Sequence, residues 1–508
     1  MTSVITVDVG TSSTKTALWD ADGHLTVETS FAYALDRPDP LWAQIDAEIW
    51  WRAVCRTIRE VIDRSGIDAR EIGGIGVDGV GWTLVAVDQH CAPLYPAMIW
   101  LDRRAQAETD WLNALPDANR LITLDANPID PAYITPKLLW LKQHEPQIFD
   151  ASYRFLTASG FIVARLSGEF TCDFTQAYGY HFFDIAHERW DAAAAAQIGV
   201  PLEKMPRLCP CTEIVGALTA AVAEQTGLRA GIPVMAGCLD AASGALGSGV
   251  TRLGQTNEQG GSAGGFAVSV DHVVVAPQLI FSHHVLARQY LLQAGTVGGG
   301  SLGWFRDMIG QPDTSFEAFS ALAEQTPPGS NGLIFIPYMA GERTPLWSSS
   351  ARGVFFGLSY KTSRADMIRA MMEGCAYAVY DNMKVAEAKG VTISECLGSG
   401  GATQSAVWCQ IKADVYSKPF IVAHRADGGE GGHSLGLYAL TAAAIGLCDS
   451  TGEAVERLLP KRQMFEPAPA RHVLYEDYFG LYRDLSRKLL ADFDHLAEIT
   501  RRYSGQIS

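Results

Sequence analysis

The sequence predicts an α/β protein with two large domains and a cleft between them. With 508 residues, of which 48% are hydrophobic and 19% charged, the chain is globular and long enough for two such domains. A strand, a Gly- and Ser-rich turn and a second strand are predicted at 4–20 and again at 257–271. Two copies of such a unit that face each other form a cleft able to clamp a nucleotide. We therefore divide the chain into domains at 1–251 and 252–446 and a charged, helical tail at 447–508.

Composition and charge exclude several classes of function. The formal net charge of −16 argues against nucleic acid or an anionic membrane as a main partner, although an acidic protein still binds phosphate through backbone N–H groups and helix N-termini. The ten Cys are scattered, and Cys209 and Cys211 have no matching Cys or His pair, which disfavours a zinc site and favours reduced thiols in a cytoplasmic protein. The start of the sequence lacks the basic region of a signal peptide, and no apolar run approaches the ~18 residues of a membrane span.

The stretch 232–250, IPVMAGCLDAASGALGSGV, contains the strongest catalytic candidate. An apolar run at 234–236 predicts a buried strand, and Asp240 is the only charged residue of the stretch. Small residues follow, which suits a helix packed closely beneath a site. A lone carboxylate at a strand end in apolar surroundings is a candidate general base. The alternative is that Asp240 is a helix N-cap, and the stretch alone does not decide between the two.

The loop after the first strand has the composition of a phosphate cradle. It reads DVGTSSTK at 8–15, and its backbone amides and hydroxyls are able to surround phosphate oxygens. Asp8 at the strand end is a candidate ligand of Mg²⁺, through water, because magnesium retains much of its hydration. An ordinary hairpin turn is the alternative. Lys15 is not a P-loop lysine, because the second Gly of that motif is missing.

Gly-rich loops recur at strand ends along the rest of the chain, at 257–271, 293–305, 395–420 and 424–446. Any one of them could be a plain turn. A helix N-terminus behind such a loop attracts anions, however, and backbone amides of the loop add to this. Five such loops and one isolated acid between the two halves therefore favour an enzyme that handles phosphate.

Two further strand ends combine aromatic and acidic residues. The segment EIGGIGVDGVGWTLVAVD at 71–88 matches G-x-G-x-x-G, but a strand pattern follows instead of a helix, so the dinucleotide-binding interpretation fails. We expect two strands joined by a Gly-lined bend that exposes Asp78 and Trp82. The next segment, PAMIWLDRRAQ, ends a strand at Trp100 and presents Asp102. Aromatic faces and carboxylates together bind polyols, whereas the alternative is a core Trp and a surface Asp–Arg pair.

In its motifs the chain resembles the FGGY family of sugar kinases, within the actin-like ATPase superfamily, over nearly its whole length. The most specific match is to the second signature of the family, GVFFGLS at 353–359 followed by DMIRAMME at 366–373. DVGTSSTK and GGSAG at 260–264 resemble the two phosphate motifs, GSGGATQSAVWCQIKAD at 398–414 resembles the adenosine motif, and Asp240 falls on the catalytic Asp. The resemblance implies two actin-like, ribonuclease H-like domains around a catalytic cleft, with sugar binding and the catalytic Asp in 1–251 and nucleotide binding in 252–446.

The resemblance also assigns roles to individual residues, with ATP and Mg²⁺ as cofactors. Asp240 would be the catalytic base and Asp8 would lie near the metal. The residues implied for the nucleotide are Gly10, Thr11, Ser12, Ser13, Lys15, Gly261, Ser262, Gly299, Gly300, Gly400, Gly401, Ala402 and Gln404, and those implied for the sugar are Asp78, Trp82, Trp100, Asp102 and Asp240.

Within the family, segments such as RPDPLWAQIDAEIWW, PKLLWLKQHEP and IPYMAGERTPLW are similar to those of xylulokinases. This implies ATP-dependent phosphorylation of the terminal hydroxyl of a ketopentose, D-xylulose to D-xylulose 5-phosphate. The departures lie where the sugar should bind, because 80–83 reads Val-Gly-Trp-Thr instead of Gln-Met-His-Gly and Ala241 replaces the usual polar residue. The segment 76–82 also resembles the rhamnulokinase loop. Ribulose, L-xylulose, rhamnulose or a glycerol-like polyol therefore stays open as the acceptor.

Two rival functions remain at this stage. A non-enzymatic nucleotide switch such as actin would need a filament surface or a peptide-binding appendage, and the tail at 447–508 offers neither. A relative that binds sugar without turnover is disfavoured by the intact Asp8, Asp240 and phosphate loops. A homodimer is compatible with the resemblance, since family members often dimerise.

Overall fold

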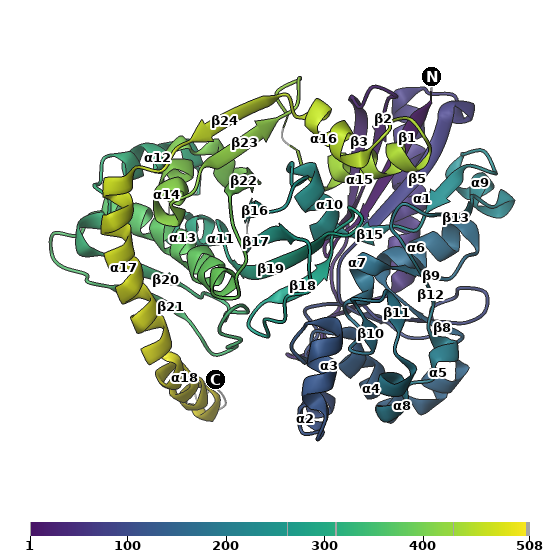
Figure 1. Cartoon of the computed structure of the whole chain (residues 1–508), viewed down its shortest axis with the longest axis horizontal. Coiled ribbons are helices and arrows are strands. Elements are labelled where there is room, and N and C mark those ends of the chain that lie inside the picture. The colour runs from purple at the N-terminus through teal and green to yellow at the C-terminus, as the bar shows by residue number, and fades with distance from the viewer. Residues whose placement is uncertain (1, 262, 310–311, 430, 504–508) are drawn as a thin grey trace.

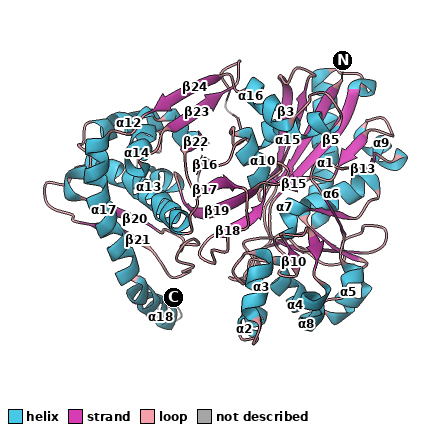
Figure 2. Ribbon diagram, in the orientation of Figure 1, coloured by secondary structure: helices cyan, strands magenta, loops and turns pink. Residues whose placement is uncertain are grey.

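The chain folds into two α/β lobes that lie side by side (Figure 1). The structure is a computed structural model that describes residues 2–261, 263–309, 312–429 and 431–503. Each lobe contains a seven-stranded mixed sheet, and Figure 2 shows helices packed around both. The predicted α/β class with two domains is therefore confirmed.

The N-terminal sheet has the strand order β13-β14-β5-β1-β2-β3, with β15 attached to β5. The predicted hairpin is formed by β1 and β2, where Asp8 lies opposite Lys15. Strands β1 and β5 are parallel, with Asp8 beside Asp78, so their carboxyl ends meet at one edge of the sheet. The strands are β1 (Ser3–Val9), β2 (Ser13–Trp19), β3 (Leu25–Ala32), β5 (Ile72–Gly79), β13 (Ile214–Ala217), β14 (Pro233–Met235) and β15 (Cys238–Leu239).

The C-terminal sheet repeats this arrangement, in the order β18-β19-β17-β16-β22-β23-β24. Its first two strands again form a hairpin, and the first is again parallel to the strand that follows on its other side. The similarity between 8–20 and 257–271 in the sequence thus corresponds to a repeated topology. The strands are β16 (Gln255–Gly260), β17 (Ala263–Val270), β18 (Ile280–His283), β19 (Tyr290–Val297), β22 (Glu395–Ser399), β23 (Phe420–His424) and β24 (Lys461–Phe465).

The two ends of helix α1 (Ala47–Ser65) are determined by local sequence. The Asp46 side chain accepts a hydrogen bond from the Glu48 amide at its start, and Gly66 in the left-handed region ends it. Its buried face packs against β2 and β3. The other helices packed near the N-terminal sheet are α6 (Ala158–Ser167), α9 (Ala220–Thr226) and α10 (Asp240–Gly247).

Much of the N-terminal lobe is a mainly helical insertion that lies beside its sheet (Figure 1). Within 133–149 a helix ends before Pro146, because Pro146 cannot continue it and instead starts a second, short helix. The insertion contains α2 (Gln106–Asn113), α3 (Ala118–Asp125), α4 (Ile134–His144), α5 (Pro146–Ala151), α7 (Phe174–Ala177), α8 (Ala192–Gln197) and the short strands β4 (Gln44–Ile45), β6 (Val85–Val87), β7 (Ala97–Met98), β8 (Arg154–Leu156), β9 (Thr171–Asp173), β10 (Phe183–Asp184), β11 (Arg189–Trp190) and β12 (Arg207–Cys209).

The C-terminal lobe is organised around α13 (Arg364–Ala388). Ser363 and Asp366 form a capping box at its start, in which each side chain accepts from the backbone amide of the other. In the tail, β24 is a strand that we did not predict; it pairs with β23. The remaining elements are β20 (Ile334–Pro337), β21 (Gly353–Phe356), α11 (Gly300–Met308), α12 (Phe316–Glu324), α14 (Ala406–Tyr416), α15 (His433–Ala444), α16 (Thr451–Leu458), α17 (Pro469–Lys488) and α18 (Leu490–Tyr503).

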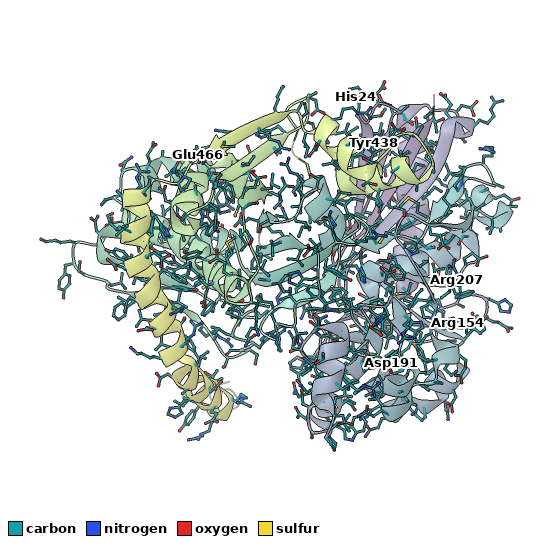
Figure 3. The ribbon with its side chains drawn as sticks, in the orientation of Figure 1. His24, Arg154, Asp191, Arg207, Tyr438 and Glu466 are labelled. Atoms are coloured by element: carbon teal, nitrogen blue, oxygen red, sulfur yellow. The ribbon has the colours of Figure 1, made fainter. Side chains whose placement is uncertain are left out.

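Helix α15 follows the C-terminal sheet in the chain but packs against the N-terminal one. It contacts β1, β5, α10 and α16. Tyr438 of α15 stacks on Trp19 of β2 at 5.2 Å between ring centroids, and Figure 3 shows Tyr438 near His24 of the β2–β3 turn. The division of the chain at residue 446 therefore does not follow the packing, because the last helix of the second sequence domain is shared with the first lobe.

The contact between α10 and α15 is made by glycines. The Gly432 amide donates to the carbonyl of Gly247 at 3.0 Å, and a Cβ on Gly247 would lie 1.9 Å from the Gly432 oxygen. A Cβ on Gly436 would lie 2.0 Å from the Ser243 oxygen. The small residues after Asp240 thus allow two helices to approach backbone to backbone, as the sequence predicted.

Two further features concern the apolar character of the helices and the state of the cysteines. Among the helices of the described residues, none has the length and apolar character needed to cross a lipid bilayer. The ten Cys are all unpaired thiols, eight of them buried. Burial agrees with the predicted reduced state.

Candidate active site

Three carboxylates meet where the N-terminal sheet ends. Asp8 and Asp78 are neighbours on parallel strands, and Cys238, two residues before Asp240, pairs with Asp78 on the other side. Burial raises the pKa of Asp78, and the nearby carboxylates of Asp8 and Asp240 add to the shift. Such a cluster of acids is a feature of catalytic or cation-binding sites.

Asp240 is the first residue of α10 and not its N-cap, which is Leu239. Its Oδ1 accepts from the Ala241 amide at 2.6 Å. Burial raises the pKa of Asp240 to about 6, a shift that His433 opposes and Asp8 reinforces. A carboxylate with this pKa is ionised at neutral pH and yet basic enough to accept a proton from a hydroxyl. The N-cap alternative for Asp240 is therefore not what the structure has, and the general-base role stays a prediction.

Asp78 corrects one expectation. It was expected to be exposed at a bend, but its side chain is 0% exposed, because β5 runs through the centre of the sheet and Asp78 lies under α10. The Ser243 hydroxyl donates to Asp78 Oδ2 and also to the carbonyl of Asp240 at 2.9 Å. Burial holds the pKa of Asp78 well above its usual range. Asp78 thus supports the first turn of α10 from below and has no surface to offer a sugar in this structure.

The first phosphate loop is held in place by three contacts. Tyr33 donates through its hydroxyl to the carbonyl of Gly10 at 2.7 Å and through its amide to the carbonyl of Ser12. The Trp100 indole donates to Thr11 Oγ1 at 3.0 Å, which joins a predicted sugar residue to a predicted phosphate residue. Ser13 begins β2 and its carbonyl accepts from the Gly10 amide, so the loop is a tight turn.

A polar cavity of about 370 Å³ lies between the N-terminal sheet and residues 425–437, which include the start of α15. Asp8 and Lys15 line it from the N-terminal sheet, and Arg425 and His433 line it from the other side. Asp8 is partly buried, and none of the described residues donates a hydrogen bond to its carboxylate. Burial raises the pKa of Asp8, while His433 and Lys15 act in the opposite direction. An unpaired carboxylate next to a phosphate loop fits one ligand of a hydrated Mg²⁺ ion.

A second cavity, of about 620 Å³, lies in the C-terminal lobe. The structure brings Gly261 and Gly299 together there, since the Gly299 amide donates to the Gly261 carbonyl at 2.8 Å. Gly300 begins α11 next to them. Gly400 has a φ of 80°, and a Cβ added to it would lie only 3.1 Å from the backbone of Gly260 and Gly261. The predicted residues that line this cavity are Gly261, Gly299, Gly401, Ala402 and Gln404. Ser262 lies outside the described residues.

The predicted sugar residues lie next to one another but are more buried than expected. Trp82 is 4% exposed rather than presented by a bend, because it packs on Tyr133 at 4.3 Å and on Tyr178 at 5.8 Å between ring centroids. Asp102 is fully buried, accepting from the Ala43 amide at 2.7 Å and pairing with Arg104. The ion pair between Asp102 and Arg104 is thus buried, and it is not the surface Asp–Arg pair that was the alternative. Trp100 alone of the three remains partly exposed.

Several residues of these surfaces were missed in the sequence. His433 and Arg425 line the polar cavity, and Arg343 from the C-terminal lobe places its guanidinium 4.8 Å from the Trp100 ring. The only signal for His433 was a Gly-rich loop before a helix, and for Arg343 a polar loop between two strands. The 620 Å³ cavity is also lined by Phe316 and Ser320, which belong to no motif, and by Trp408, which lies in the segment 398–414 but was not singled out there.

Comparison with known proteins decides the family. Residues 3–247 match the N-terminal domain model of the FGGY family of carbohydrate kinases, and residues 266–444 match its C-terminal domain model. The chain belongs to the FGGY family of carbohydrate kinases. Both lobes therefore belong to a carbohydrate kinase fold, one family domain in each.

Individual FGGY relatives cover almost the whole chain. A xylulose kinase of Escherichia coli is 31% identical over 489 residues, which are 96% of this chain and 99% of that protein. A gluconokinase of Bacillus subtilis is 25% identical over 515 residues, or 99% of each chain. The crystal structure of a xylulose kinase from Rhodospirillum rubrum superposes with a TM-score of 0.87 at 29% identity, covering 97% of this chain and 100% of that one.

Proposed function

We propose that the protein transfers the terminal phosphoryl group of ATP to the terminal hydroxyl of a ketopentose, with D-xylulose as the first candidate and D-xylulose 5-phosphate as its product. The observation that carries the proposal is Asp240, a partly buried carboxylate at the start of α10 whose raised pKa is influenced by Asp8 and His433, two residues that line the polar cavity. The similarity to xylulose kinases over 96% of the chain supports the choice of sugar.

In the proposed mechanism, Asp240 accepts the proton of the sugar hydroxyl as its oxygen attacks the phosphorus in line. The 620 Å³ cavity holds the adenosine between residues 401–404 and α12. The phosphates then extend past Gly261 and Gly299 toward Thr11 and Lys15. Positioning supplies most of the rate enhancement, because reactants that are already bound lose no further translational and rotational entropy in the chemical step.

Asp8 is the residue that would hold Mg²⁺, which neutralises charge on the phosphates when bound. Its carboxylate faces the same cavity as the ammonium of Lys15. Lys15 is exposed there and able to contact a phosphate oxygen directly. Ser243 links the first turn of α10 to Asp78, and this contact fixes the position of Asp240 at the start of that helix.

A second candidate acceptor is a different ketose, a polyol or gluconate. Two observations favour keeping it. Residues 80–83 and Ala241 depart from the xylulokinase pattern, and the gluconokinase of Bacillus subtilis matches 99% of the chain. A non-enzymatic nucleotide switch is disfavoured by the presence of Asp8, Asp240 and both cavities.

The test is a coupled assay of ATP consumption over a panel of acceptors. The panel contains D-xylulose, L-xylulose, D- and L-ribulose, L-rhamnulose, glycerol, erythritol and gluconate. We expect ATP consumption that requires one of them, with D-xylulose giving the highest kcat/KM. A higher kcat/KM for another acceptor would move the assignment to that sugar. ATP hydrolysis that no acceptor stimulates would contradict a sugar kinase.

A further inference from the structure

Lys137 is the most deeply buried cation of the N-terminal lobe. It lies on α4 and is 0% exposed. Its Nζ donates three hydrogen bonds to backbone carbonyls, those of Trp82 at 2.7 Å, Ile99 at 2.6 Å and Ala132 at 2.6 Å. An ammonium group has three N–H donors, so all of them are used by the main chain.

The three carbonyls belong to three separate segments, and two of these segments carry a predicted sugar residue. Trp82 is itself a predicted sugar residue. Ile99 directly precedes Trp100, whose indole binds the phosphate loop. Ala132 belongs to the turn after Asp130, whose carboxylate pairs with Arg103. The Lys137 side chain therefore links these three segments to one another through its three hydrogen bonds.

The backbone at Trp82 shows why a clamp is needed. Its φ is 49°, in the left-handed region that a bulky aromatic residue rarely adopts. Such a conformation persists only where the surroundings hold it, and it concentrates at ligand sites. The Trp82 ring packs on Tyr133, which follows Ala132, so the clamp holds both partners of the aromatic contact.

We propose that Lys137 is a positioning residue of the sugar site: its ammonium group holds the loops of Trp82, Trp100 and Asp130 at the spacing that the acceptor sugar requires, without touching the sugar. This inference rests on the proposed sugar kinase function. It also distinguishes the sugar side from the nucleotide side, since the 620 Å³ cavity is lined by none of the three loops.

The first test replaces Lys137 with Met, which keeps the length of the stem and removes the donors. We expect the KM and the calorimetric Kd for the sugar to rise about tenfold or more, because three buried carbonyls lose their donor and the loops around the sugar are no longer preorganised. The Kd for ADP should change less than about twofold, because none of the clamped segments lines the 620 Å³ cavity and the clamp reaches the phosphate side only through the Trp100–Thr11 hydrogen bond. Equal affinity for sugar in Lys137→Met and wild type would overturn the proposal.

Lys142 provides a matched control on the same helix. Its Nζ also donates to a carbonyl, that of Gly199 at 2.6 Å, but at an exposed position away from the three loops. Lys142→Met should leave the sugar KM unchanged. If both substitutions raise the sugar KM equally, the effect belongs to α4 as a whole and the positioning role is refuted. Lys137→Arg, which keeps the charge and several donors, should recover part of the affinity.

A second measurement needs no substitution and decides the matter if Lys137→Met does not fold. Burial lowers the pKa of Lys137 to about 7, with Asp102 and Asp130 opposing the shift and Arg103 and Arg104 adding to it. Above that pH the neutral amine retains two N–H donors, so one carbonyl loses its partner. The sugar KM of the wild type should therefore rise between about pH 6 and 8.5 while the KM for ATP stays level. A sugar KM that is flat over this range would overturn the proposal.

The two proposals fail in different ways. If the wild type phosphorylates no acceptor of the panel, the sugar kinase function fails. If the wild type turns over a sugar but Lys137→Met binds that sugar normally, the function stands and only the positioning role of Lys137 is lost.

Discussion

The buried ion pair between Lys412 and Glu258 tests how much a single buried charge costs in the free energy of unfolding. Lys412 on α14 contacts Glu258 on β16 at 2.7 Å between Nζ and Oε2, and each side chain is 3% exposed. Lys412→Met keeps the apolar stem but leaves the Glu258 carboxylate buried without its cation. Removing one partner of a buried pair costs about 3–5 kcal/mol. At about 2–4 °C per kcal/mol for a unit of 150–250 residues, Tm should fall by roughly 6–20 °C.

Thermal unfolding followed by circular dichroism measures this shift. The matched control is the double variant Glu258→Met with Lys412→Met, which removes both charges at once. Because an apolar pair of similar volume often replaces a buried ion pair without loss, the double variant should be more stable than the single one. A Tm of Lys412→Met within about 2 °C of the wild type, or a double variant less stable than the single one, would refute the reasoning.

Three further predictions concern catalysis and the contact between the lobes. Because burial raises the pKa of Asp240 to about 6, kcat should fall about tenfold per pH unit below pH 6 as the carboxylate takes up a proton, and a rate that stays level from about pH 5 to 7 would contradict this. Gly247→Val should lower both Tm and kcat, since even its Cβ would lie 1.9 Å from the Gly432 oxygen. Gly303→Ala, which has open space around it, should lower neither. Equal melting curves for the two variants would count against the close helix contact. Phe316→Ala should raise the KM for ATP several-fold and leave the sugar KM unchanged, because Phe316 lines only the nucleotide cavity; steady-state kinetics with each substrate varied in turn would show a wrong assignment as a change in the sugar KM.

Much of the architecture could be predicted because its signals are local. The loop at 8–15, the stretch around Asp240 and the capping box at Ser363 each combine turn or cap residues with an adjacent apolar run, and these patterns act over a few residues. The repeated hairpin at 257–271 could be recognised for the same reason. These segments lie in the structure where the sequence placed them.

The burial of Asp78 and Trp82 could not be predicted, because it depends on what packs above them. The Gly-rich bend suggested exposure, whereas α10 covers Asp78 and the ring of Tyr133 covers Trp82. The path of α15 back to the first lobe was equally hidden, since its partner Trp19 is more than 400 residues away in the chain. Contacts of this kind are set by tertiary structure and leave no mark on local composition.

Exchange of Asp240 for Asn, with chemistry and binding measured on the same sample, tests the central claim most directly. The amide has nearly the shape of the carboxylate but accepts no proton, so kcat should fall by about 10²–10⁴-fold, or about 2.7–5.4 kcal/mol at 1.36 kcal/mol per tenfold, while the Kd values for ADP and sugar stay near those of the wild type. The variant should also be at least as stable at neutral pH, because the raised pKa means that the native state disfavours the charged form above about pH 6. A correctly folded Asp240→Asn enzyme that turns over at the wild-type rate would contradict the account.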